Sequence, residues 1–419
     1  MRAPRVAYFP DSFHEVNGVA HTSRNFVAFA ARHDLPFLCV RAAGTRNGIE
    51  SRVLDTGQLR ELELMRSRTA IRLEKDLEFD GLFWRHHDAI EWQLKLFRPD
   101  LIHITGPSEL GMFGAYFAWK LGVPLAASWH TNVHEYLARR NAGLTRLLPS
   151  AYAARAAQGI ESATLNAAAR FYRLAQVLFA PNLELCAMLE AATGKPCHLM
   201  QRGVDTELFS PARRTRAAAS SNGAASRIVL GYVGRLSVEK NIALLVRVAR
   251  ELQALGLANI HFLIIGQGGD EAELRTDLGR IDPAAEFAGV LRGEALATAY
   301  ANMDLFLFPS HTDTFGNVVL EALASGVPAI VTPDGGPKYI VRDGETGFIV
   351  PDEGFTAAIA TLIRDPARLN TMRFAARDHA LGCSWDAVFH RVYAAYDTAF
   401  DQNCDQTPLS PPLSSELRR

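Results

Sequence analysis

The chain has 419 residues, more than one ordinary domain holds, so two domains are expected. Its 44 basic and 45 acidic residues give a net charge of -1, which argues against a protein that binds nucleic acid through an overall positive field. Five cysteines are scattered without a CxxC pair, so neither a zinc ribbon nor a disulfide framework is expected, and a reducing compartment is favoured.

The N-terminal residues MRAPRVAYFPDSF enter an apolar strand almost at once and lack the long apolar core and cleavage site of a signal peptide. The sequence therefore predicts a cytoplasmic protein. Residues 111–129 resemble a membrane span, but Lys120, Gly122 and Pro124 interrupt them after a helix-length piece. A buried helix, a turn and a strand are predicted there instead.

Short apolar runs alternate with helix-length segments along the chain, which is typical of a parallel sheet with helices on both faces. In the first half the expected strands are residues 5–9, 37–40, 101–104, 125–129 and 176–181. In the second half they are residues 227–234, 261–266, 285–289, 305–310 and 328–332. Two doubly wound α/β halves are predicted.

Two segments lack this apolar periodicity. Residues 212–226, ARRTRAAASSNGAAS, are predicted to form a flexible insertion at the start of the second half. The tail, residues 401–419, is rich in Pro and Ser and is predicted to be disordered.

A cationic loop follows the expected strand 227–234. Functional residues of open α/β sheets lie beyond the carboxyl ends of strands. Arg235 and Lys240 occupy this position, next to backbone amides that a glycine leaves accessible. Two cations near a helix N-terminus suit a phosphate or diphosphate. Solvated side chains without a ligand are the alternative.

The segment TDTFGNVVLEALASG, which follows the expected strand 305–310, carries two carboxylates. Asp313 lies in the loop, and Glu321 lies in the following helix among apolar residues, where an unpaired charge would be costly. Free amides around Phe315, Gly316 and Asn317 could hold a sugar hydroxyl or a phosphate oxygen. Glu321 could accept hydrogen bonds from a ribose diol. Structural salt bridges are the alternative for either carboxylate.

Three further polar or glycine-rich motifs follow strands. His130 ends the strand LAASW and is either structural or functional, and the order HTNVHE is not the zinc motif HExxH. Gly18 follows the first strand and either lets a ligand approach the backbone or forms a turn. GQGGDEAEL has Glu271 where a dinucleotide motif needs its third glycine, which disfavours a nicotinamide enzyme.

In combination, these motifs resemble a known enzyme family. GRLSVEKN, IIGQGGDEAEL, SHTDTFGNVVLEALASGVPAI and GGPKYIVRDGETGFIV resemble the C-terminal half of the retaining, GT-B-fold glycosyltransferases of family GT4. DSFHEVNGVAHTSRNF and SWHTNVHEYL resemble its N-terminal half, particularly the branch of lipid α-mannosyltransferases and sulfoquinovosyl- or glucosyl-diacylglycerol synthases. The likeness covers roughly residues 5–395 in motif order.

The resemblance implies a GT-B fold, in which two doubly wound Rossmann-like domains face a central cleft and the C-terminal helix crosses back to the first domain. The implied acceptor-binding domain is residues 1–205, with residues 375–400 packed back on it. The implied nucleotide-sugar-binding domain is residues 206–374.

The resemblance also implies roles for single residues. Arg235 and Lys240 would bind the donor diphosphate, and Glu321 would hold the nucleotide ribose. Asp313 would touch the transferred sugar and is one methylene shorter than the Glu that is commoner there. His130 would contact the sugar from the other domain. The remaining implied donor contacts are the closing loop at Gly18, the backbone at Gly289 and Val290, which would read the base, and the amides of Phe315, Gly316, Asn317 and Val318.

The predicted reaction is retaining transfer of a hexose, with mannose favoured, from a nucleotide-diphosphate sugar to a lipid or saccharide acceptor. No cofactor is expected, and no metal, because the sequence has no evident DxD motif and the cations can take the metal's place. One alternative is a UDP-sugar-dependent glucosyl, N-acetylglucosaminyl or sulfoquinovosyl transferase. Alternatives of another class are a sugar-nucleotide epimerase and a non-catalytic sugar-nucleotide-binding protein.

An arginine-rich stretch bears on the acceptor. Residues 136–180 contain six arginines against one acid, Glu161, with Leu, Tyr and Phe between them. Such a stretch indicates a basic surface for anionic lipid at the inner face of a membrane, or a solvated helix face. No nucleic-acid partner is expected.

Overall fold

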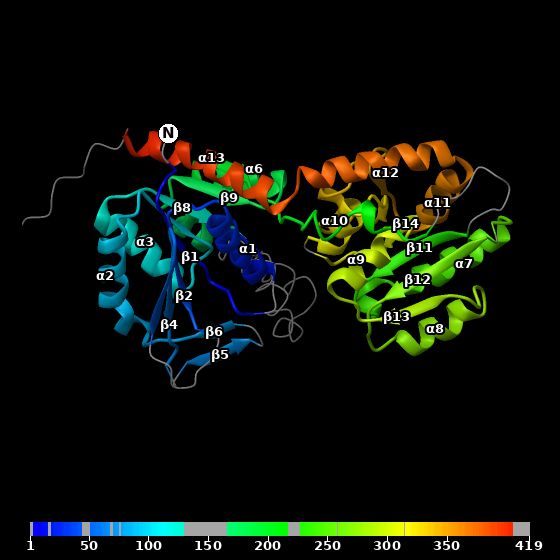
Figure 1. Cartoon of the computed structure of the whole chain (residues 1–419), viewed down its shortest axis with the longest axis horizontal. Coiled ribbons are helices and arrows are strands. Elements are labelled where there is room, and N and C mark those ends of the chain that lie inside the picture. The colour runs from blue at the N-terminus through cyan, green and yellow to red at the C-terminus, as the bar shows by residue number, and fades with distance from the viewer. Residues whose placement is uncertain are drawn as a thin grey trace, which may run out of the picture. The chain divides into compact units, whose positions relative to one another are not determined.

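The computed structural model of the chain describes residues 3–15, 18–43, 51–67, 70–74, 77–129, 166–216, 227–257, 259–313 and 315–404. The chain forms two compact units (Figure 1). Unit 1 is Met1–Gln201 together with Val388–Arg419, and unit 2 is Arg202–Ala387. The boundaries between the two units lie at Gln201/Arg202 and Ala387/Val388. The boundaries predicted from the sequence are 205/206 and 374/375.

Unit 1 is built on an eight-stranded sheet with the order β10-β9-β8-β7-β1-β2-β4-β3. Its neighbouring strands are parallel except for the β3–β4 pair, and a separate antiparallel pair is formed by β5 and β6. The strands are β1 (Val6–Phe9), β2 (Phe37–Ala42), β3 (Arg52–Thr56), β4 (Leu59–Leu64), β5 (Ile71–Glu74), β6 (Leu77–Phe79), β7 (Leu101–Ile104), β8 (Leu125–Ser128), β9 (Val177–Ala180) and β10 (Cys197–Leu199).

The central strands of unit 1 are buried along their whole length, because helices pack against the sheet. These helices are α1 (Gly18–Arg32), η1 (Phe83–His86), α2 (His87–Phe97), α3 (Glu109–Leu121) and α6 (Leu183–Thr193). In α3, the Ser108 hydroxyl caps the first turn by accepting from the Gly111 amide, and Gly122 ends the helix with a left-handed φ of 66°. The helix, turn and strand predicted within residues 111–129 are confirmed. In the described residues, no helix is long and apolar enough to cross a membrane.

The last helix, α13 (Trp385–Cys404), begins in unit 2 and continues in unit 1 (Figure 1). Phe389 stacks on Phe26 of α1 with ring centroids 4.4 Å apart. The Tyr396 hydroxyl lies 2.6 Å from Nδ1 of the buried His103. The predicted return of the C-terminal helix to the first domain is therefore confirmed. The helix extends past residue 401, where the sequence placed the start of a disordered tail, and residues 405–419 lie outside the described part.

Unit 2 contains a six-stranded, wholly parallel sheet with the order β13-β12-β11-β14-β15-β16. The strands are β11 (Ile228–Val233), β12 (Ile260–Ile265), β13 (Glu286–Gly289), β14 (Leu305–Phe308), β15 (Ala329–Val331) and β16 (Gly347–Ile349). Counted along the chain, this is the Rossmann order 3-2-1-4-5-6. The order reverses between β11 and β14, which fixes where a ligand crevice is expected.

The helical segments of unit 2 connect these strands. They are η2 (Pro211–Arg213), η3 (Val238–Lys240), α7 (Ala243–Ala254), α8 (Glu271–Gly279), α9 (Gly293–Ala301), α10 (Asn317–Ala324), η4 (Pro337–Tyr339), η5 (Asp352–Gly354), α11 (Phe355–Arg364) and α12 (Pro366–Leu381). The first residues of the predicted flexible insertion are fixed, because Arg214 and Arg216 pair with the buried Asp304. Residues 217–226 of that insertion lie outside the described part.

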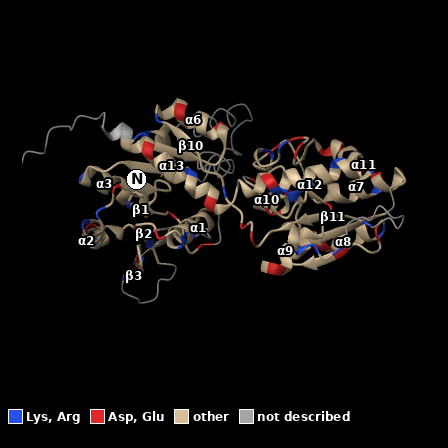
Figure 2. Cartoon of the chain, turned by 45° about the horizontal axis from the view of Figure 1, so that its top comes forward, with Lys and Arg blue, Asp and Glu red and all other residues tan. Residues whose placement is uncertain are grey.

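All the strands expected from the sequence are present, so the prediction of two doubly wound halves is confirmed. Strands β3, β4, β5, β6, β10 and β16 were not predicted. They are short, or charged like LRELEL in β4, where Glu63 pairs with Arg41 and Arg52. Basic and acidic residues are interspersed over both units, in keeping with the net charge of -1 (Figure 2).

Candidate functional site

The predicted polar residues of unit 2 meet beyond the carboxyl ends of β11 and β14. These two strands are neighbours, with Leu230 opposite Leu305 and Gly231 opposite Phe306. Because the strand order reverses between them, the loops that follow them border the place where open α/β sheets are expected to bind their ligands, here called the crevice. The loop after β11 carries Arg235 and Lys240, and the loop after β14 carries Asp313.

Lys240 and Asp313 form an ion pair across this crevice. Lys240 Nζ lies 2.8 Å from Asp313 Oδ2, and the two side chains are 17% and 25% exposed. Arg235 instead pairs with Glu239 at 3.1 Å, and its side chain is 68% exposed. An exposed pair of this kind is weakly held, so the Arg235 guanidinium can move to another anion at little cost.

The loop that leads into α10 depends on a glycine. Gly316 has a φ of 90°, which L-residues rarely adopt, and an added Cβ would lie 3.0 Å from Cγ of Pro337. Among the described residues, no side chain caps the first turn of α10. Two nearby oxygens, Oδ1 of Asn317 and Oγ of Ser237, are buried without a hydrogen-bond partner in the described structure. Buried polar atoms normally have partners, so this edge of the sheet is left with unsatisfied hydrogen-bonding groups.

Glu321 lies in the second turn of α10 and meets a phenol. The Tyr300 hydroxyl, from α9, donates to Glu321 Oε2 at 3.0 Å. Burial raises the pKa of the Glu321 carboxyl from its ordinary 4.5 to about 7, and the hydrogen bond from Tyr300 opposes that rise. The sequence predicted a polar partner for Glu321 but not Tyr300, because no spacing rule links residues on separate helices.

The GQGG glycines have a packing explanation. A Cβ on Gly266 would lie 1.8 Å from the Gly234 carbonyl oxygen, and one on Gly268 would lie 2.0 Å from that of Leu236. The loops after β11 and β12 therefore pack backbone to backbone.

Gly289 and Val290 lie at the carboxyl end of β13, at the same edge of the sheet as the crevice. The Gly289 carbonyl accepts from the Gly266 amide at 2.8 Å, and Val290 is 50% exposed. These two residues are thus separated from β11 by one strand, β12.

A second polar cluster flanks the crevice and was not predicted. His311 Nδ1 lies 2.8 Å from Asp334 Oδ2, and its Nε2 lies 3.1 Å from Asp352 Oδ1. The Asn241 amide donates to the other oxygen of Asp352 at 2.9 Å. His311 lies three residues after the end of β14, so its position beyond a strand end was the available indication.

Family models match both halves of the chain. The model described as Glycosyltransferase Family 4 matches residues 42–208, and the one described as Glycosyl transferases group 1 matches residues 227–365. A GDP-mannose-dependent alpha-mannosyltransferase from Mycolicibacterium smegmatis is 34% identical over 309 residues, which are 73% of this chain and 75% of the relative. The chain belongs to glycosyltransferase family 4. A sulfoquinovosyl transferase from Arabidopsis thaliana is 30% identical over 314 residues, 72% of this chain and 57% of the relative.

Solved glycosyltransferase structures share the fold. A glycosyltransferase from Rickettsia africae superposes with a TM-score of 0.64 at 14% identity, covering 95% of this chain and 99% of that one. Sucrose-phosphate synthase from Thermosynechococcus elongatus gives 0.61 at 18% identity, with the same coverage. The predicted GT-B fold and the prediction of a glycosyltransferase that uses a nucleotide sugar are confirmed.

The predicted residues of the first domain are only partly described in this glycosyltransferase. His130 lies outside the described residues, as do the arginines between 136 and 165. Gly18 is the first residue of α1 and follows the loop after β1. Arg173 donates to the Ala192 carbonyl at 2.7 Å, and Arg170 is exposed.

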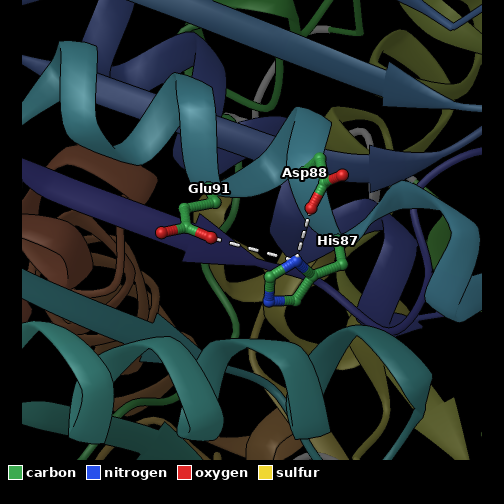
Figure 3. A group of neighbouring side chains, drawn as sticks. All are labelled: His87, Asp88 and Glu91. Atoms are coloured by element: carbon green, nitrogen blue, oxygen red, sulfur yellow. Dashed lines mark hydrogen bonds and ion pairs between the residues drawn. The ribbon is translucent and has the colours of Figure 1, made fainter. Parts of the chain in front are cut away.

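One group of potential metal ligands lies on α2 of unit 1, whereas the crevice residues belong to unit 2. His87, Asp88 and Glu91 bring one ligand atom each to within 4.8 Å of the others (Figure 3). The Glu91 carboxylate, however, also binds Lys95 at 2.7 Å and Lys120 at 2.9 Å. These hydrogen bonds lower the pKa of Glu91 to about 2. Two ammonium groups already neutralise the carboxylate, so this cluster is better explained as a surface ion-pair network.

Proposed function

We propose that this glycosyltransferase transfers a hexose, with mannose as the first candidate, from a nucleotide-diphosphate sugar to a lipid or saccharide acceptor. The observation that carries the proposal is the Lys240–Asp313 ion pair beyond the ends of the neighbouring strands β11 and β14, in the loop that leads into α10 with Glu321. The mannose preference rests on the Mycolicibacterium smegmatis relative, which is named for GDP-mannose.

In this proposal, Lys240 and Asp313 take separate roles when the donor binds. Lys240 and Asp313 neutralise each other in their ion pair. A donor diphosphate would compete for Lys240 and Arg235, which frees Asp313 to accept a hydrogen bond from a hydroxyl of the transferred sugar. Glu321 would accept from the ribose hydroxyls, and the amides of the first turn of α10 would bind phosphate or sugar oxygens.

Charge development explains how such a site would accelerate transfer. As the bond from sugar to phosphate breaks, negative charge grows on the leaving phosphate, so the cations stabilise the transition state more than the bound substrate. In this proposal the cations take the place of a divalent metal, and configuration is retained by attack on the face from which the phosphate leaves.

Nucleotide titration tests the proposal. Calorimetry with GDP, UDP and ADP should show one preferred nucleoside diphosphate, and the Lys240→Ala variant should lose it. GDP selectivity supports mannosyl transfer. UDP selectivity favours the second candidate, a UDP-sugar-dependent transferase, which the sulfoquinovosyl transferase relative makes reasonable. A folded protein that binds none of the three would overturn the donor site.

For the acceptor side we propose contact with lipid through an aromatic face of unit 1. Exposed tryptophans occur on each of η1, α2 and α3: Trp84 is 53% exposed, Trp92 66% and Trp119 78%. These are three of the five tryptophans in the chain, and Leu82, Leu96 and Met112 are exposed on the same elements. Tryptophan favours the membrane interface, because its ring is apolar and its N–H can reach water. This face replaces the arginine-rich stretch as the described candidate for membrane contact.

Vesicle sedimentation tests this contact. Wild-type protein should sediment with phosphatidylcholine vesicles containing phosphatidylglycerol, and Trp92→Ser with Trp119→Ser should abolish sedimentation. Leu183→Ser is the matched control, because Leu183 is 72% exposed on α6 of the same unit. Equal loss in the control, or no loss in the double variant, would rule out the aromatic face.

A further inference from the structure

Among the described residues, Arg202 is a cation beside the crevice that has no counter-ion. It is the first residue of unit 2, and its guanidinium carbon lies 5.3 Å from the ring centroid of Phe315. Within the described structure the guanidinium makes no hydrogen bond and no ion pair. Burial lowers the pKa of Arg202, and no neighbouring carboxylate opposes this effect.

The other arginines of unit 2 whose pKa burial lowers are compensated. Arg373 pairs with Asp304 at 2.7 Å, and Arg377 donates to three backbone carbonyls at 2.6 to 3.0 Å. Removing a charge from water is unfavourable unless a partner replaces the lost hydration. Burial acts on Arg202 as it does on these two arginines, but no described residue supplies Arg202 with such a partner.

The backbone that carries Arg202 is firmly placed. A Cβ on the next residue, Gly203, would lie 2.8 Å from the Trp385 Cα and 2.5 Å from its ring. The Val204 amide donates to the Cys383 carbonyl at 3.1 Å. The guanidinium is thus held against Phe315, in the loop that precedes Gly316 and the uncapped start of α10.

We infer that Arg202 binds a phosphate group of the donor, as a third cation beside Lys240 and Arg235 at the start of α10. This inference rests on the proposed function. A guanidinium matches phosphate oxygens with paired N–H groups and stays charged when partly buried. Lys240 must leave Asp313 and Arg235 must leave Glu239 to reach a ligand, whereas Arg202 is paired with no carboxylate of the described residues.

The test compares Arg202→Met with a matched control. Methionine keeps an apolar stem against Phe315 but removes the charge. The control is Arg368→Met, because the Arg368 guanidinium lies 5.2 Å from the Phe348 ring, a contact of the same kind elsewhere in unit 2. For each protein, calorimetry gives the affinity for GDP and for guanosine, and a thermal scan gives the Tm without ligand. UDP and uridine replace them if the wild type selects UDP.

Arg202→Met should lower the affinity for the nucleoside diphosphate at least about tenfold, because one charge-assisted contact is lost. The affinity for the nucleoside should not change. Its Tm without ligand should equal or exceed that of the wild type, because an uncompensated charge has been removed. Arg202→Lys should recover part of the diphosphate affinity.

Three results overturn the inference. The first is an unchanged diphosphate affinity in Arg202→Met. The second is an equal loss for the nucleoside, and the third is a lowered Tm, which a purely structural contact with Phe315 would produce. If the wild-type protein bound no nucleoside diphosphate, the proposed function itself would be wrong. The experiment therefore distinguishes a wrong role for Arg202 from a wrong proposed function.

Discussion

Replacing Glu321 by glutamine should stabilise the ligand-free protein at alkaline pH. The carboxyl has a pKa of about 7 in the folded chain, against an ordinary 4.5, because burial disfavours its charged form. The folded state therefore binds this proton more tightly than the unfolded state does. The stability contribution of Glu321 is complete below pH 4.5, declines as the pH rises from 4.5 to 7, and is lost above that.

A pKa difference of this size corresponds to about 3 kcal/mol, and partial exposure of the carboxylate reduces the expected penalty to about 2 kcal/mol. Glutamine keeps the shape and accepts the hydrogen bond from Tyr300, but it does not ionise. Glu321→Gln should therefore exceed the wild type by about 2 kcal/mol at pH 8, a rise in Tm of about 4–8 °C for a unit of this size. At pH 5 the two proteins should be nearly equal.

Thermal unfolding of wild type, Glu321→Gln and Tyr300→Phe between pH 5 and pH 9 measures this effect. Tyr300→Phe removes the hydrogen bond that lowers the pKa of Glu321, so its pH-dependent stability loss should begin at the same pH as in the wild type but continue to higher pH. A glutamine variant that is less stable than the wild type at pH 8 would refute the reasoning, because the carboxylate would then be well compensated. In Glu321→Gln, the affinity for the nucleotide-sugar donor should also fall.

Three further predictions concern the crevice and its support. Lys240→Ala should lower kcat/KM by about 100-fold or more without changing the circular dichroism spectrum, and wild-type turnover would contradict the assigned role. Gly316→Ala should destabilise the protein by about 1–2 kcal/mol, since a φ of 90° is unfavourable for alanine; an unchanged Tm would show that the loop adjusts without strain. Asp304→Asn should cost about 3–5 kcal/mol in urea unfolding, because three arginines share this buried carboxylate, and a loss below 1 kcal/mol would show that they find other partners.

The sequence by itself determined the elements of the fold and the places of several site residues. Apolar runs of strand length predicted the central strands of both sheets, because a strand covered on both faces must be apolar throughout. The loops after 227–234 and 305–310 were therefore known to lie beyond strand ends, together with Arg235, Lys240 and Asp313. An acid within the apolar helix of residues 317–324 also predicted that Glu321 meets a polar group.

Only the tertiary structure decided which of these residues meet. Lys240 touches Asp313 because β11 lies beside β14, and strand order is set by the packing of the whole unit. Tyr300 reaches Glu321 from another helix, and no short-range pattern connects them. The uncompensated charge of Arg202 is likewise invisible in the sequence. A local pattern records which face of an element is buried, whereas a partner or its absence depends on residues brought together from distant parts of the chain.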